Sequence, residues 1–84
     1  MLVSQVQPEY TPEAREARIQ GTIELRATVR EDGTVKVEEV KRGLGYGLDE
    51  AASAAVEQWR FRPGTINGKP VKVMMSILVN FSLR

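Results

Sequence analysis

Side chains able to do acid–base or nucleophilic chemistry are few in this sequence. It has no histidine and no cysteine, which removes the commonest general base, the commonest metal ligand and every thiolate site. Carboxylates adjoin at Glu38–Glu39 and Asp49–Glu50, but neighbouring residues do not face each other on a strand or a helix. The serines lack a histidine partner and a Ser-x-x-Lys motif. We therefore expect a binding module without enzymatic activity, metal or cofactor, and only carboxylates paired by the fold stay open as a catalytic alternative.

Two further stretches have the composition of ligand sites. The first, "KRGLGYGLDE", holds Gly43, Gly45 and Gly47 before a predicted helix, as phosphate-binding loops do. No Lys-Ser/Thr pair follows and no parallel-strand unit surrounds it, so this stretch indicates a turn between elements. In the second, "AVEQWRFRPG", arginines alternate with aromatic residues, a composition also found in nucleic-acid-binding proteins.

The aromatic residues of this second stretch fit a structural role better. Apolar spacing changes from period 3.6 to period two at Trp59, and Pro63 favours extended chain before it. We expect both aromatic side chains, Trp59 and Phe61, to enter the core. The two arginines, Arg60 and Arg62, are expected on the outside. A net charge of +1, from 12 basic and 11 acidic residues, also argues against a nucleic-acid partner.

Length and composition favour one folded domain. The 84 residues are 42% hydrophobic and 27% charged, which separates the chain from disordered sequences. No apolar run is long enough to span a membrane, and the first ten residues lack the pattern of a signal peptide. We therefore expect nothing within the chain itself to export or anchor it.

Periodic patterns define the elements that position these residues. A short helix is predicted over residues 12–18, and alternation predicts a strand over residues 23–30 with one solvated, charged face. Asp32–Gly33 predicts a tight hairpin turn, because both residues tolerate positive φ. In the returning strand Val40 is out of phase, which indicates a bulge near Glu38–Glu39.

The second predicted helix covers residues 48–59. Its apolar residues share one face, at spacings of four, seven, eight and eleven from the first. They are Leu48, Ala52, Ala55, Val56 and Trp59. The alanines allow close approach to a sheet, so the large side chains at the two ends must supply much of the burial.

The C-terminal part of the chain predicts an unusually long strand. After a hairpin turn at Asn67–Gly68, apolar residues alternate over residues 71–83, and Met74 and Leu78 fall on the outer face. No proline and no charge interrupts residues 73–83. Edge strands usually carry such blocking residues. The strand is therefore either covered by a neighbour, such as a second copy of the chain, or has an edge that is meant to pair.

These stretches, in this order, resemble the C-terminal domain of TonB energy transducers. The matching segments are "PEYTPEAREARIQGTIEL", "EDGTV", "GLGYGLDEAASAAVEQWRFRPG" and "NGKPVKVMMSILVNFSL". The resemblance implies an α+β fold with two helices packed on one face of a three-stranded, or slightly larger, antiparallel sheet. It implies a single domain over residues 1–84, of which residues 1–9 are partly ordered. The membrane helix and Pro-rich spacer of such transducers are absent from this chain.

The resemblance also implies a function. Such domains lie in the periplasm of Gram-negative bacteria, tethered to the inner membrane and linked to an ExbB–ExbD-type motor. They bind the TonB box, a short extended segment of an outer-membrane transporter, and transmit proton-motive force for siderophore, vitamin and nutrient uptake. Addition of a strand to an open sheet edge fits this role. By resemblance the receiving residues are Val73, Met74, Met75, Ser76, Ile77, Leu78, Val79 and Asn80, with a secondary contact at Gln7.

Two other functional classes stay open. One is a structural domain that self-associates, because the same edge can pair two copies into a homodimer. Its mark is a mass that depends on concentration without peptide binding. The other is a small nucleic-acid-binding α/β domain, which needs a Gly-x-x-Gly clamp or aromatic residues exposed on the sheet. Its mark is an affinity that falls steeply with salt.

Overall fold

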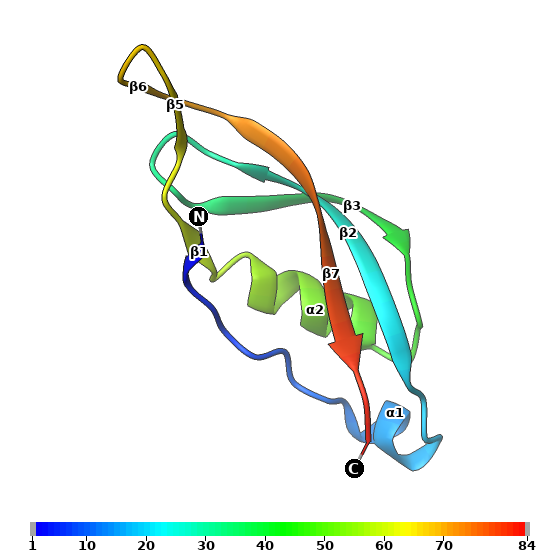
Figure 1. The fold of residues 1–84 in the computed structure, drawn as a ribbon. Helices are drawn as coiled ribbons and strands as arrows, with labels where there is room; N and C mark the ends of the chain where they lie inside the picture. Colours follow the sequence, from blue (N-terminus) through cyan, green and yellow to red (C-terminus); the bar gives the residue numbers. More distant parts are fainter. Residues whose placement is uncertain (1, 84) are drawn as a thin grey trace.

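Seven strands and two helices build residues 2–83, the part of the chain that the computed structural model describes (Figure 1). They are β1 (Leu2–Ser4), α1 (Pro12–Glu16), β2 (Gly21–Val29), β3 (Val35–Arg42), α2 (Leu48–Val56), β4 (Arg60–Phe61), β5 (Gly64–Ile66), β6 (Lys69–Val71) and β7 (Val73–Phe81). The main sheet has the strand order β3-β2-β7, and β1-β4 and β5-β6 form separate antiparallel pairs. The α+β fold expected from the sequence is confirmed.

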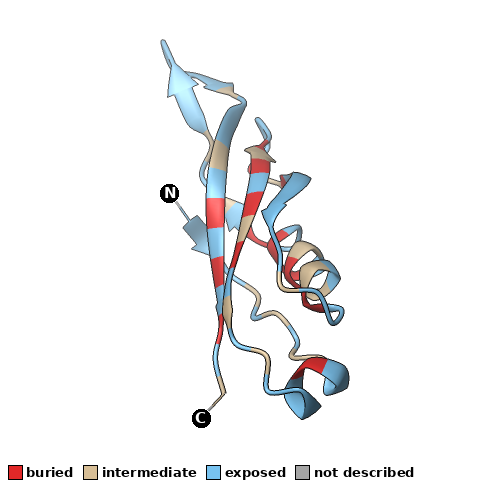
Figure 2. Cartoon of the chain, turned by 90° about the vertical axis from the view of Figure 1, so that its right-hand side faces the viewer, coloured by how far each residue is buried: buried red, intermediate tan, exposed pale blue. Residues whose placement is uncertain are grey.

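Strand β2 lies at the centre of the main sheet and sets its register. It pairs with β7 through nine consecutive residues, from Gly21 opposite Phe81 to Val29 opposite Val73, without a shift. Because side chains alternate between the two faces, one set of β2 residues is buried throughout (Figure 2). These residues are Ile23, Leu25, Ala27 and Val29.

Both helices lie on the same side of the main sheet (Figure 2). Thr11 caps α1 as its sequence indicates, since its hydroxyl oxygen accepts a hydrogen bond from the Ala14 amide (3.2 Å). Helix α2 contacts β2 and β3. Its predicted apolar face is confirmed, because all five residues of that face are buried. The helix itself ends at Val56, and Trp59 follows after a turn.

Trp59 joins the helix to the N-terminal segment. Its side chain is buried, and the indole Nε1–H donates to the Val6 carbonyl (2.8 Å). The chain before Val6 forms β1, which pairs with β4, so Leu2 lies opposite Phe61. The predicted inward orientation of Trp59 is confirmed, and Phe61 is half-buried beside it. Arg60 is exposed, as expected.

The two hairpins differ in how well their turns follow the sequence. At Asn67–Gly68 both φ angles are positive, at 52° and 78°, as the pattern predicts. At Asp32–Gly33 the predicted hairpin is also found, but its turn differs from the two-residue type, because only Gly33 has a positive φ (88°). Arg30 and Thr34 close a three-residue loop instead, and the Asp32 carboxylate accepts hydrogen bonds from the Thr34 hydroxyl and amide. These bonds, the hydroxyl's first, lower the pKa of Asp32.

The bulge predicted in β3 is also found. Arg26 lies opposite Glu39 and Ala27 opposite Val37, so Glu38 has no partner residue on β2. A second shift occurs between Glu24 and Leu25. No helix within residues 2–83 has the length and apolar character needed to cross a membrane.

Gly33 offers a test of how the hairpin is joined to β4. Its carbonyl accepts from the Phe61 amide (2.9 Å), and a Cβ added at Gly33 would lie 2.3 Å from the Phe61 carbonyl oxygen. Gly33→Ala should therefore lower the free energy of unfolding, measured with urea, by more than the about 1–2 kcal/mol that left-handed strain alone costs. Gly68→Ala is the matched control, because Gly68 also has positive φ (78°) but nothing within 4 Å. Equal losses for the two variants would contradict a tight contact at Gly33.

Candidate partner-binding edge

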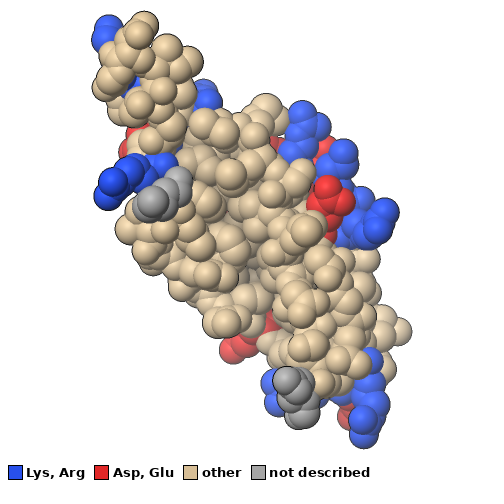
Figure 3. All heavy atoms as spheres, viewed as in Figure 1, with Lys and Arg blue, Asp and Glu red and all other residues tan. Residues whose placement is uncertain are grey.

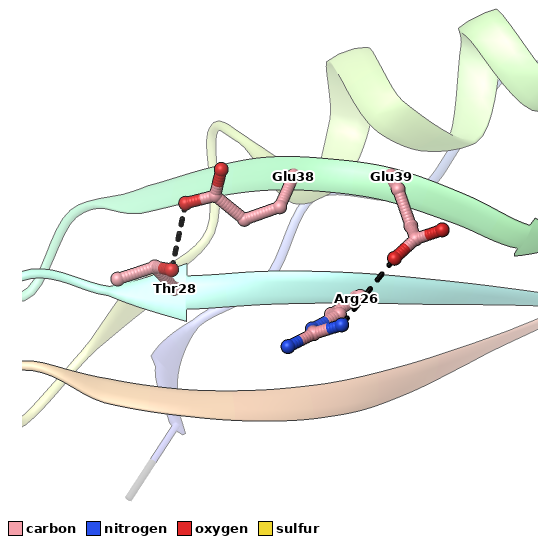
Figure 4. A network of polar contacts seen from close by, with 4 residues as sticks. All are labelled: Arg26, Thr28, Glu38 and Glu39. Carbon is pink, nitrogen blue, oxygen red and sulfur yellow. Dashed lines mark hydrogen bonds and ion pairs between the residues drawn. The ribbon is translucent and has the colours of Figure 1, made fainter.

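The carboxylates that could have formed a catalytic pair are engaged in structural contacts. Glu38 accepts a hydrogen bond from the Thr28 hydroxyl (2.8 Å), and Glu39 pairs with Arg26 (3.4 Å; Figure 4). These contacts confirm the expected cross-strand pairing on a solvated face. Residues 2–83 contain no group of three or more acidic residues placed to hold a metal ion.

The glycine-rich stretch before α2 also binds its own chain. The Asp49 carboxylate accepts hydrogen bonds from the Leu44 amide (2.8 Å) and the Gly45 amide (3.4 Å). A Cβ at Gly43 would collide with the same carboxylate at 2.4 Å. The amides of this loop thus bind a carboxylate of the chain itself, which supports the turn predicted there.

Strand β7 has one paired edge and one unpaired edge. Its partner is β2, and within residues 2–83 no strand pairs with its other side. All eight residues predicted to receive a partner strand, Val73 to Asn80, lie in β7. The sequence also assigned residues 71 and 72 to this strand, but Lys72 interrupts it and Val71 belongs to β6.

Backbone hydrogen-bonding groups alternate in direction along each strand, and this alternation determines which amides and carbonyls of β7 face away from β2. The Arg30 amide donates to the Thr34 carbonyl (2.8 Å), so even-numbered residues of the adjoining β2 direct their backbone groups to β3. The odd-numbered residues therefore face β7, and the odd-numbered residues of β7 face them in return. The amides and carbonyls directed away from β2 are those of Met74, Ser76, Leu78 and Asn80.

The same four residues place their side chains on the face without helices. Met74 and Leu78 are 55% and 66% exposed, large values for apolar side chains. The Thr22 hydroxyl donates to the Asn80 side-chain oxygen (3.2 Å). Acidic and basic side chains gather beside this strand and leave an uncharged band along it (Figure 3). The free edge is thus both unpaired and uncharged over its whole length.

The opposite edge of the sheet, on β3, is protected. Two register shifts interrupt it, and charged residues such as Lys36 and Glu38 are exposed along it. The Val37 amide, which points away from β2, donates to the Glu57 carboxylate at the end of α2 (3.0 Å). Bulges, charges and capped amides are the devices that prevent strand addition. The sheet therefore has one edge fit for pairing and one that is not.

Gln7 lies apart from this edge. It is exposed in the segment before α1 and lines a shallow groove with Pro8 and with residues of α2, including Ala51 and Gln58. None of the residues that line this groove belongs to β7. A secondary contact at Gln7 stays a prediction.

Sequence reasoning missed a second feature next to the free edge. An apolar groove of about 320 Å³ lies beside the first residues of β7. It is lined by Val29, Phe61, Arg62, Pro63, Gly64, Val73 and Met75. The signal in the sequence is that Val73 and Met75 continue the alternation of apolar residues that point to the core. In the structure the core does not fully cover these two side chains.

Residues 6–83 match the sequence profile of the family described as Gram-negative bacterial TonB protein C-terminal. The chain is 35% identical over 77 residues to Protein TonB of Xanthomonas campestris pv. campestris (strain B100), which covers 90% of the chain. It is 31% identical over 84 residues to Protein TonB of Vibrio cholerae serotype O1, which covers 99% of it. The chain spans 34% of the length of each of these relatives.

The fold is also similar to a solved structure. The solution NMR structure of the Pseudomonas aeruginosa TonB CTD superposes with a TM-score of 0.72 and is 23% identical in sequence. The match covers 99% of this chain and 85% of the other. At this identity the comparison supports the arrangement of the helices and strands.

Hydrogen exchange should reveal the two kinds of amide in β7. We expect the Ser76 and Leu78 amides to exchange rapidly, because they face solvent at the free edge. The amides of Ile77 and Val79 should be protected by the ladder to β2. An NMR exchange series on the 84-residue chain measures all four together. Uniform protection along β7 would contradict a free edge, and Val37, capped by Glu57, is the matched amide on β3.

Proposed function

Since the chain belongs to the family of Gram-negative bacterial TonB C-terminal domains, we propose that it binds the TonB box of an outer-membrane transporter as an added strand on β7. Domains of this family are adaptors of energy transduction and not enzymes. One observation carries the proposal: within residues 2–83 the outer edge of β7 is unpaired, and the strand is unbulged and uncharged from Val73 to Phe81, whereas β3 is bulged and capped. This contrast supports β7 as the edge that would receive a partner.

Backbone hydrogen bonds supply the affinity in this proposal. Each outward-facing residue of β7 offers one amide and one carbonyl, and each bond contributes a net of about 0.5–1.5 kcal/mol. Ordering of the incoming segment offsets part of this gain. The exposed side chains of Met74 and Leu78 add apolar contact on the face without helices. Binding is therefore expected to be modest and tolerant of many sequences.

The same geometry suits the transmission of force. A strand pulled along its own axis loads all of its hydrogen bonds together, so they resist as a set. The N-terminal side of the domain, toward which the motor lies in such transducers, is held by the Trp59–Val6 hydrogen bond and by the pairing of β1 with β4. In this proposal an ExbB–ExbD-type motor in the inner membrane supplies the force, and the domain works in the periplasm.

A peptide titration tests the proposal. The domain, labelled with nitrogen-15, is titrated with synthetic TonB-box-like peptides long enough to span residues 74–80. The largest amide shifts are expected at Met74, Ser76, Leu78 and Asn80, because their backbone groups would enter new hydrogen bonds. Shifts confined to other surfaces, or absent for every peptide, would contradict strand addition on β7.

A proline placed on the free edge sharpens the test. Ser76→Pro removes an outward amide without removing a bond to β2, and prolines are tolerated on such edges. It should weaken peptide binding about tenfold or more. Ser76→Thr keeps the amide and is the matched control. If the proline variant does not fold, N-methylation of the peptide backbone removes the facing donors instead, and unchanged affinity would contradict the proposal.

The free edge equally favours a second candidate, a homodimer paired through β7. Sedimentation of the chain over a range of concentrations distinguishes the two. A mass that doubles with concentration and falls for Ser76→Pro would place a second copy on the edge. A monomer at all concentrations would leave the edge to the transporter segment.

A further inference from the structure

The core-facing side chains of β7 become more exposed toward the start of the strand. Its inward residues are almost completely covered at one end, where Phe81, Val79 and Ile77 are 3%, 5% and 7% exposed. Met75 is only half-buried, and Val73 is 37% exposed. The apolar alternation of the strand therefore extends beyond the core that the chain builds for itself.

The reason lies in what covers this face. Helix α2 contacts β2 and β3 and ends at Val56, so it leaves the beginning of β7 to the linker between β4 and β5. The end of β4, this linker and the start of β5 (residues 61–64) line the apolar groove of about 320 Å³ together with Val29, Val73 and Met75. A cavity of about 150 Å³ accommodates a benzene ring, so the groove has room for one large side chain.

The pleat of the sheet determines which residue of a partner would enter the groove. Residues opposite each other on paired strands point to the same face, for either strand direction. A partner residue opposite Val73 or Met75 therefore directs its side chain to the core face, where the groove lies. Partner residues opposite Met74 or Ser76 point to the face without helices. Two residues of β7, Val73 and Met75, thus line the groove, and an added strand would approach it with the residue opposite one of them.

We propose that this groove is a specificity pocket for the incoming transporter segment, selecting a large apolar side chain such as Leu, Ile or Phe at the position opposite Val73 or Met75. The inference rests on the proposed strand addition to β7. Gly64 supports it independently, because a Cβ there would lie 3.2 Å from the Val73 Cγ2 and would begin to fill the groove. Gly64 has no positive φ, so the backbone does not require glycine at this place. A glycine here keeps the groove open.

A host peptide with a single variable position tests the pocket. The host is an acetylated, amidated strand of alternating threonine and valine that spans residues 73–80, with valines opposite the odd-numbered residues of β7 and each valine replaced in turn by Ala, Leu, Phe or Glu. At one position Leu or Phe should bind about 10- to 100-fold more tightly than Ala, since burial of such a side chain is worth that ratio. Equal affinities while the β7 amides still shift would overturn the pocket and leave strand addition intact. No β7 shift with any peptide would overturn both.

Variants of the domain separate the groove from the rest of the edge. Gly64→Leu fills the groove and should abolish the preference for Leu and Phe while the Ala peptide binds as before. Ile66→Ala, an exposed apolar residue of β5 outside the groove, is the matched control and should keep the preference. A Gly64→Leu variant that retains the preference, or a Glu peptide that binds best through Arg62, would overturn the proposal.

A direct contact measurement does not depend on any variant. Methyl groups of a carbon-13-labelled guest Leu should show nuclear Overhauser effects to the Phe61 ring and the Met75 methyl. Effects to Met74 or Leu78 instead would place the guest on the opposite face and overturn the pocket.

Discussion

The unbroken ladder between β2 and β7 is the interaction on which the rest of the molecule depends. Nine consecutive pairs without a bulge keep the pleat of both strands in phase from Gly21 to Val29. Because the phase is never lost, every second side chain of both strands points to the face that carries the helices. The same phase leaves every second amide and carbonyl of β7 directed away from the sheet. The same register therefore both buries the core of the domain and leaves the outer edge of β7 available for pairing.

The two edges of the main sheet differ in how well they are protected against the addition of another strand. An open edge is a hazard because any extended chain can add to it, and natural sheets usually block it. Here β3 is blocked by shifts in register, by charge and by the Glu57 carboxylate on the Val37 amide. Of the two edges of the main sheet within residues 2–83, that of β7 is the one left open, so the main sheet offers a partner strand one place to add. The protection of β3 would in this sense direct a partner strand to β7.

Sequence patterns predicted most elements of this fold because the patterns are local. Alternation along β2, the apolar face of α2 and the turn at Asn67–Gly68 each follow from neighbouring residues. The pairing of β1 with β4 and the Trp59–Val6 hydrogen bond were missed, because they join residues more than 50 positions apart and depend on backbone groups that any sequence supplies, such as the Val6 carbonyl that accepts from the indole. The groove was missed for a related reason: Val73 alternates like a core residue, and only the end of α2 shows that nothing covers it.

A strand added to β7 would complete this uncovered part of the core. The main-chain bonds of such a strand are the same for every sequence, so they cannot by themselves distinguish one transporter segment from another. An apolar groove at one end of the edge adds a term that depends on a single side chain. Affinity from the ladder and selectivity from the groove would then be set by separate parts of the molecule. A pulling force would act mainly on the ladder, so a change at a groove residue such as Gly64 could alter selectivity without weakening the bonds that carry the force.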